Sequence, residues 1–207
     1  MAETQAILDQ KQQIFDRWAP SYDWILPSVF YQAVHQRLLE YVTFPPEPHV
    51  LDLGCGTGRL LRRLAAEVSN LSGVGLDLSA EMLAQAQEKT QKRDRLQFLS
   101  GRSDAIPLED KTFDSVFCTI SFLHYPDPQA VMGEVARVLK PEGIFYLADY
   151  VPSEFLGVPQ QGWLTSPFGL RFYDRAMRQK LADGSGLICR AHQYLLGPIM
   201  LTLFQRV

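Results

Sequence analysis

The chain has 207 residues, a length that fits one domain with a sizeable hydrophobic core, and its 46% hydrophobic content argues against large-scale disorder. Its 20 basic and 23 acidic residues give a net charge of −3, which argues against nucleic-acid binding. The three cysteines lack metal-ligand spacing, no apolar run is long enough to span a membrane, and the N-terminus has no secretory pattern. We therefore expect a reduced, cytoplasmic protein with no metal site and no integral membrane segment.

The segment before the first predicted strand is rich in aromatic residues. Residues 6–42 predict two helices that are too apolar to form a free tail. We therefore expect residues 1–45 to form a helical cap.

From residue 49 onward, short apolar runs alternate with stretches of helical periodicity. The predicted strands are 49–53, 73–77, 96–99, 114–119 and 144–150. Ser79 is the predicted N-cap of a helix between two of them, and the sequence Lys140-Pro141-Glu142-Gly143 is expected to end the helix that begins near Pro128. This alternation predicts an α/β fold, with a parallel sheet covered on both faces.

The segment VLDLGCGTG, residues 50–58, is the most informative part of the chain. Glycine reaches positive φ without a Cβ penalty and lets a ligand approach the backbone, and the following helix directs N–H groups and a positive dipole end at that ligand. The segment therefore predicts a site for a polar or anionic cofactor. Its spacing is G-x-G-x-G, and Arg59 stands where the dinucleotide motif has its third glycine, so a nicotinamide-dependent oxidoreductase is the weaker alternative.

The last third of the chain combines a long irregular segment with a predicted hairpin. Residues 151–170 contain several prolines and aromatic residues, a composition and length that indicate a lid or binding loop. Residues 171–182 predict a helix. The strand-like runs 187–196 and 199–207 are joined by Gly197-Pro198, which predicts an antiparallel pair.

Several stretches, in order, resemble class I S-adenosylmethionine-dependent methyltransferases, and most closely the branch of the ubiquinone and menaquinone biosynthesis C-methyltransferases (methyltransferase type 11 domain). They are IFDRWAPSYD (14–23), VLDLGCGTG (50–58), GVGLDLSAEML (73–83), GRSDAIPLEDKTFDSVF (101–117), SFLHYPDP (121–128) and VLKPEGIFYLADY (138–150). The resemblance implies one Rossmann-like domain over residues 1–207, with a seven-stranded, mostly parallel sheet whose last strand is antiparallel. It also implies S-adenosyl-L-methionine as cofactor and S-adenosyl-L-homocysteine as product.

The resemblance assigns the two ends of this cofactor to different residues. Asp77 would accept the ribose hydroxyls and Asp104 the adenine amine, while Asp52 would lie near the amino group of the methionine portion. Tyr22 and Arg17 would close the site and meet the methionine carboxylate. The remaining implied cofactor residues are Gly54, Cys55, Gly56, Gly58, Leu78, Met82, Ala105, Ile106, Thr119 and Ser121.

His124 is the candidate general base, because an ordinary histidine exchanges protons near neutral pH. The alternative interpretation, a structural loop residue without a catalytic role, is the stronger one. The aromatic cap and the lid favour a small apolar or aromatic acceptor, of which a quinol-like compound is one example. Carbon, oxygen and nitrogen acceptors all remain open, and so does a protein that binds the cofactor without catalysing transfer.

Overall fold

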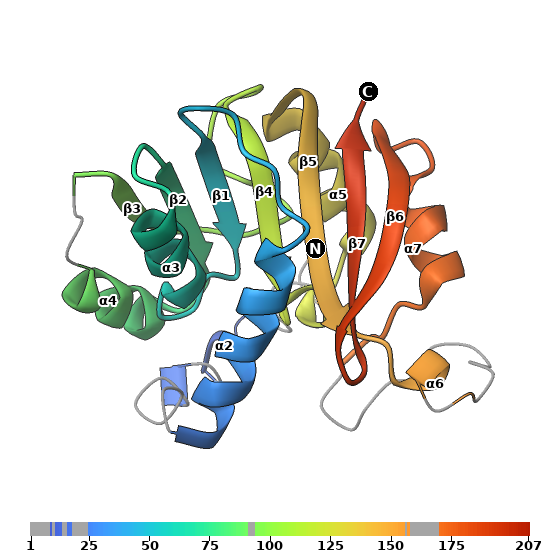
Figure 1. The fold of residues 1–207 in the computed structure, drawn as a ribbon, viewed down its shortest axis with the longest axis horizontal. Coiled ribbons are helices and arrows are strands. Elements are labelled where there is room, and N and C mark those ends of the chain that lie inside the picture. The colour runs from blue at the N-terminus through green and yellow to red at the C-terminus, as the bar shows by residue number, and fades with distance from the viewer. Residues whose placement is uncertain are drawn as a thin grey trace.

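The computed structural model describes residues 9, 11–13, 16–17, 25–90, 94–155, 157 and 170–207. This part of the chain forms one sheet of seven strands in the order β3-β2-β1-β4-β5-β7-β6 (Figure 1). The strands are β1 (His49–Leu53), β2 (Ser72–Asp77), β3 (Leu96–Ser100), β4 (Phe113–Thr119), β5 (Leu139–Tyr150), β6 (Leu187–Leu196) and β7 (Ile199–Arg206). The helices are α2 (Ile25–Leu39), α3 (Arg59–Glu67), α4 (Ala80–Lys89), the 3₁₀ turn η2 (Phe122–His124), α5 (Pro128–Val138), α6 (Pro152–Phe155) and α7 (Arg175–Ala182).

The sheet is parallel except at one end. β1 pairs in parallel with β2 and β4, β2 with β3, and β4 with β5. β7 lies antiparallel between β5 and β6, and Gly197, with a φ of 51°, makes the tight turn that joins β6 to β7. The prediction of a seven-stranded, mostly parallel sheet with an antiparallel last strand is confirmed.

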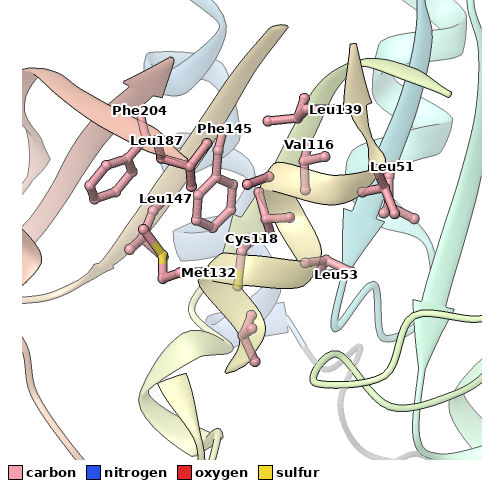
Figure 2. Close-up of a cluster of buried hydrophobic side chains, with 14 of the residues drawn as sticks. Leu51, Leu53, Val116, Cys118, Met132, Leu139, Phe145, Leu147, Leu187 and Phe204 are labelled. Atoms are coloured by element: carbon pink, nitrogen blue, oxygen red, sulfur yellow. The ribbon is translucent and has the colours of Figure 1, made fainter. Parts of the chain in front are cut away.

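Helices cover both faces of the sheet. In β4, Val116 belongs to the buried cluster formed with α5 and α7, while its neighbour Phe117 belongs to the cluster formed with α2 and α3. Figure 2 shows the first cluster, in which Met132 of α5 lies among side chains of the central strands and of β6 and β7. Because successive residues of a strand point to opposite faces, this alternation places one hydrophobic core on each side of the sheet.

The structure confirms two predicted helix boundaries, the start of α4 and the end of α5. Ser79 caps α4, because its hydroxyl accepts a hydrogen bond from the Met82 N–H at 3.2 Å. α5 ends at Val138, just before the predicted terminator at residues 140–143. β5 begins at the next residue, Leu139, and not at residue 144 as predicted, because Leu139 already pairs with Phe113 of β4.

α7 begins later than the sequence predicted. It starts at Arg175, because Asp174 is its N-cap and accepts a hydrogen bond from the Met177 N–H at 2.8 Å. The preceding Arg171 N–H donates instead to the carbonyl of Leu123, which ties this segment to η2. The predicted start at residue 171 is therefore wrong by about one turn.

Parts of the predicted cap and lid lie outside the described residues. Residues 9, 11–13 and 16–17 are helical, and α2 lies in the second half of the segment predicted to form the cap. Within the predicted lid, α6 follows β5, and residues 156 and 158–169 are outside the described part. The three cysteines are free, and none of the described helices combines the length and apolarity that crossing a membrane requires.

Candidate functional site

The glycine loop, residues 54–58, connects the carboxyl end of β1 to α3 (Figure 1). All three of its glycines have positive φ, with 68° at Gly54, 52° at Gly56 and 71° at Gly58. A Cβ added at Gly54 would lie 1.9 Å from Ser121 Oγ, so this position also needs glycine for space. The loop therefore keeps bare backbone at the edge of the sheet where parallel strands usually bind ligands.

Asp77, the last residue of β2, is held by backbone donors. Its Oδ2 accepts from the Gly56 N–H at 2.8 Å and its Oδ1 accepts from the Ser79 N–H at 2.9 Å. Burial raises the pKa of this carboxyl, while the backbone hydrogen bonds oppose the shift. One carboxylate thus links the glycine loop to the start of α4 and is fixed in orientation.

A cavity beside Asp77, which we name the Asp77 cavity, brings residues from four sequence motifs together. Gly54 and Gly56 form part of its wall, and Met82 of α4 is almost fully buried there. It is lined by Lys11, Gly54, Gly56, Asp77, Leu78, Met82, Gly101, Arg102, Ser103, Asp104, Ile120, Ser121, His124, Tyr125, Pro126 and Val131. The predicted residues Gly54, Gly56, Asp77, Leu78, Met82, Asp104, Ser121 and His124 therefore share one cavity.

A second cavity, which we name the Asp52 cavity, lies against the same loop. Gly54 and Gly56 line both cavities, so the loop forms a common wall. The lining consists of Tyr31, His35, Asp52, Gly54, Cys55, Gly56, Thr57, Arg59, Leu60 and Thr119. The predicted residues Asp52, Cys55 and Thr119 thus line the Asp52 cavity and not the Asp77 cavity.

Asp52 is buried, and its Oδ1 has no hydrogen-bond partner among the described residues. The loop N–H groups, which could have satisfied it, are used elsewhere: those of Gly54 and Cys55 donate to the carbonyl of Leu76. Burial, with a further contribution from Asp77, raises the pKa of Asp52 well above its ordinary value. An unsatisfied buried polar atom is costly, so Asp52 indicates a missing partner at this position.

The predicted adenine-contact segment is only partly at the cavity. Asp104 lines it, but both carboxylate oxygens accept from the Arg102 guanidinium, at 2.9 and 2.7 Å, and this contact lowers the pKa of Asp104. Ala105 is exposed. Ile106 packs in the core, and its N–H donates to Glu134 Oε2 at 2.6 Å. The side chains of Ala105 and Ile106 therefore do not line the Asp77 cavity.

His124 lies in the Asp77 cavity, but its surroundings differ from those of an ordinary histidine. Burial lowers its pKa to about 4, and Lys11 adds to this effect. Lys11 Nζ donates to the carbonyl of His124, and burial, followed by Arg171, lowers the pKa of Lys11 to about 8. The imidazole is therefore neutral at pH 7.

Ile120, Tyr125 and Lys11 are examples of lining residues of the Asp77 cavity that were not among the predicted site residues. Ile120 has a φ of 52°, a rare conformation for a β-branched residue, and such strain is concentrated at functional sites. Tyr125 Oη accepts a hydrogen bond from Ser121 Oγ at 2.9 Å and lies beside Gly54. Tyr125 belongs to the SFLHYPDP stretch, so the motif could have indicated it, whereas no local signal identifies Lys11.

Other predicted residues have different locations. Gly58 lines neither cavity, and a Cβ there would lie 2.7 Å from the ring of Phe98, so its role in the structure is close packing. Tyr22 lies outside the described residues. Arg17 lies in a described helical stretch but lines neither cavity. The described residues contain no cluster of three His, Cys, Asp or Glu side chains that could hold a metal ion.

Comparisons with known proteins show what the chain is similar to. Residues 51–147 match the family model of a methyltransferase domain. The demethylmenaquinone methyltransferase of Lactiplantibacillus plantarum is 36% identical over 141 residues, which are 65% of this chain and 60% of that protein. The malonyl-[acyl-carrier protein] O-methyltransferase of a Marinomonas species is 33% identical over 139 residues, 66% of this chain and 51% of that protein.

The fold has solved counterparts as well. A chain of the Haloferax volcanii complex between a methyltransferase activator and a methyltransferase matches with a TM-score of 0.77 and 22% identity, covering 93% of this chain and 97% of that one. At this identity the likeness shows the fold alone. The chain spans only 51% and 60% of the lengths of the two curated relatives above.

Proposed function

We propose, from the match of residues 51–147 to the family model of a methyltransferase domain, that this protein transfers a methyl group from S-adenosylmethionine to a small acceptor. The observation that carries the proposal is the glycine loop, which lines two cavities. One contains Asp77, and the other contains Asp52, whose Oδ1 has no hydrogen-bond partner among the described residues. This arrangement offers separate places for the sugar and for the amino-acid end of one ligand.

The residues present fit such a cofactor. Asp52 Oδ1 lacks a donor, and an ammonium group on the methionine portion would supply one. On the other side of the loop, Asp77 is oriented by two backbone N–H groups and would accept from ribose hydroxyls. Met82 and Leu78 would pack near the base, with Asp104 within the same cavity.

The chemistry then needs little from acid or base side chains. S-adenosylmethionine, when bound, supplies a methyl group on a positively charged sulfur that is already activated. The protein's part is to orient an acceptor and to exclude water, which together can contribute on the order of 7–11 kcal/mol. Ser121 and Tyr125, hydrogen-bonded to each other against Gly54, would shape this part of the wall.

For the acceptor we propose a small, largely apolar or aromatic molecule, with a quinol-like compound as one candidate. Ile120, Pro126 and Val131 give the Asp77 cavity an apolar side, and one relative is named for demethylmenaquinone. Another relative is named for a malonyl group on a carrier protein, so the family supports more than one acceptor. His124 is the candidate base for an acceptor that must lose a proton.

Thermal unfolding with different ligands tests the cofactor. S-adenosylmethionine or S-adenosylhomocysteine at 100 times its dissociation constant should add ~2.7 kcal/mol to the free energy of unfolding, whereas NADH should add nothing. Asp77→Asn should remove most of this gain, because an amide cannot accept at both oxygen positions. Asp110→Asn, which changes an exposed carboxylate near Arg137, is the matched control and should keep it.

The outcomes separate the alternatives. Stabilisation by NADH alone would favour an oxidoreductase and contradict the proposal. An equal gain in the Asp77→Asn variant would reject the ribose assignment only. Transfer of a radiolabelled methyl group across a set of small molecules then distinguishes an enzyme from a protein that only binds the cofactor.

A further inference from the structure

A third cavity borders the Asp52 cavity and is rich in arginine. This arginine cavity is lined by Gln32, His35, Arg59, Arg62, Arg63 and Glu67. It shares His35 and Arg59 with the Asp52 cavity. Arg59 therefore lines both the arginine cavity and the Asp52 cavity, which contains the unpartnered Asp52 Oδ1.

The position of Arg59 is unfavourable for the helix that carries it. Arg59 is the first residue of α3, and the first turn of this helix contains no acidic residue. A cation near a helix N-terminus opposes the helix dipole, where an acidic side chain would be favoured. Natural sequences break local preferences mainly at functional sites, and Arg59 lines the Asp52 cavity.

The Asp52 cavity presents opposite charges to a ligand. Asp52 has an unsatisfied carboxylate oxygen, and Arg59, whose guanidinium stays charged at every relevant pH, lines the same cavity. His35 adds no charge, because burial, followed by Arg63 and Arg59, lowers its pKa to about 4. A carboxylate acceptor and a guanidinium donor in one small cavity complement a group that carries an ammonium and a carboxylate on the same carbon.

We infer that Arg59 binds the carboxylate of the methionine portion of S-adenosylmethionine, while Asp52 receives its ammonium group. This inference rests on the proposed function and adds a residue that the sequence motifs did not assign to the cofactor. The resemblance gave the carboxylate to Arg17 and Tyr22. Arg17 lines neither cavity at the loop, and Lys11 lies on the Asp77 side with the proposed nucleoside contacts.

A matched pair of ligands isolates the contact. S-adenosylmethionine and its decarboxylated analogue differ only in the carboxylate, and isothermal titration calorimetry gives the ratio of their dissociation constants. The wild-type protein should prefer S-adenosylmethionine by roughly 10- to 100-fold, the range expected of charge-assisted hydrogen bonds. In Arg59→Ala the ratio should fall close to one, and in Arg59→Lys, which keeps the charge without the planar fork, it should be intermediate.

Arg63→Ala is the control, since Arg63 lines the arginine cavity but not the Asp52 cavity and should leave the ratio unchanged. A full preference retained in both Arg59 variants would overturn the inference while leaving the proposed function intact. A ratio that falls close to one in Arg17→Ala but not in Arg59→Ala would also overturn the inference and leave the proposed function intact. Failure of the wild-type protein to bind either ligand would reject the proposed function itself. The Lys variant keeps the test decisive if the Ala variant does not fold.

Discussion

At the scale of single residues, His124 shows how the environment changes the chemistry of a side chain. Burial and Lys11 lower its pKa from 6.5 to about 4. A general base works in its unprotonated form, so activity that depends on His124 should rise with pH through about 4 and stay level above it. We therefore predict that kcat/KM for methyl transfer has no inflection between pH 6 and pH 7.

The measurement is a pH–rate profile for wild type and His124→Asn with an acceptor found in the radiolabel assay. An inflection near pH 6.5 that disappears in His124→Asn would show that this histidine titrates normally, against its buried placement. An inflection near 8 in both proteins would direct attention to Lys11, whose pKa is lowered to about 8.

At the scale of elements, Arg178 joins α7 to the strands that end the sheet. It is buried, and its guanidinium donates to the carbonyls of Met200 at 2.9 Å and Asp149 at 3.1 Å and to Thr202 Oγ1 at 3.0 Å. Asp149 Oδ2 in turn accepts from the Leu123 N–H at 2.9 Å, which fixes η2 beside the Asp77 cavity. We predict that Arg178→Met lowers the free energy of unfolding by about 3–5 kcal/mol. The substitution removes the hydrogen-bond donors of several buried acceptors and the positive charge near the buried Asp149 carboxylate.

Urea unfolding of both proteins measures this loss. Arg175→Met is the matched control on the same helix, where the guanidinium lies 5.5 Å from the centre of the Tyr194 ring. Such a contact at the surface contributes only about 0.5–1 kcal/mol. Equal losses in the two variants would contradict the bridging role of Arg178.

At the scale of the whole molecule, buried carboxylates and buried imidazoles give stability opposite dependences on pH. Burial raises the pKa of Asp149 from 3.8 to about 6, so its contribution is present below pH 3.8 and is lost as pH rises through about 6. Burial lowers the pKa of His35 from 6.5 to about 4, so its contribution is present above pH 6.5 and is lost as pH falls toward 4. We predict that Asp149→Asn becomes more stable relative to wild type as pH rises from about 4 to 7.

The free energy of unfolding, measured in urea at several pH values, tests this sign. His35→Gln supplies the opposite case and should gain relative to wild type as pH falls. A difference between Asp149→Asn and wild type that does not change with pH would show that the carboxyl of Asp149 is not shifted.

The sequence by itself determined the parts of this protein that depend on local pattern. Alternating apolar runs predicted the strands, Ser79 predicted a helix start that its hydroxyl indeed caps, and the Gly197-Pro198 link predicted the closing hairpin. These signals are local because hydrogen bonds, periodicity and turn geometry act within a few residues. The composition of the glycine loop likewise predicted a cofactor site, and its three glycines do have positive φ.

Only the tertiary structure decided how that site is divided and which charges face it. Asp52 and Asp77 lie 25 positions apart in the chain numbering, and the loop places them in different cavities. The orphaned oxygen of Asp52, the neutral state of His124 and the place of Arg59 beside His35 all depend on burial and on contacts between distant segments. Desolvation and long-range packing cannot be inferred from neighbouring residues, because they are set by which elements the fold brings together.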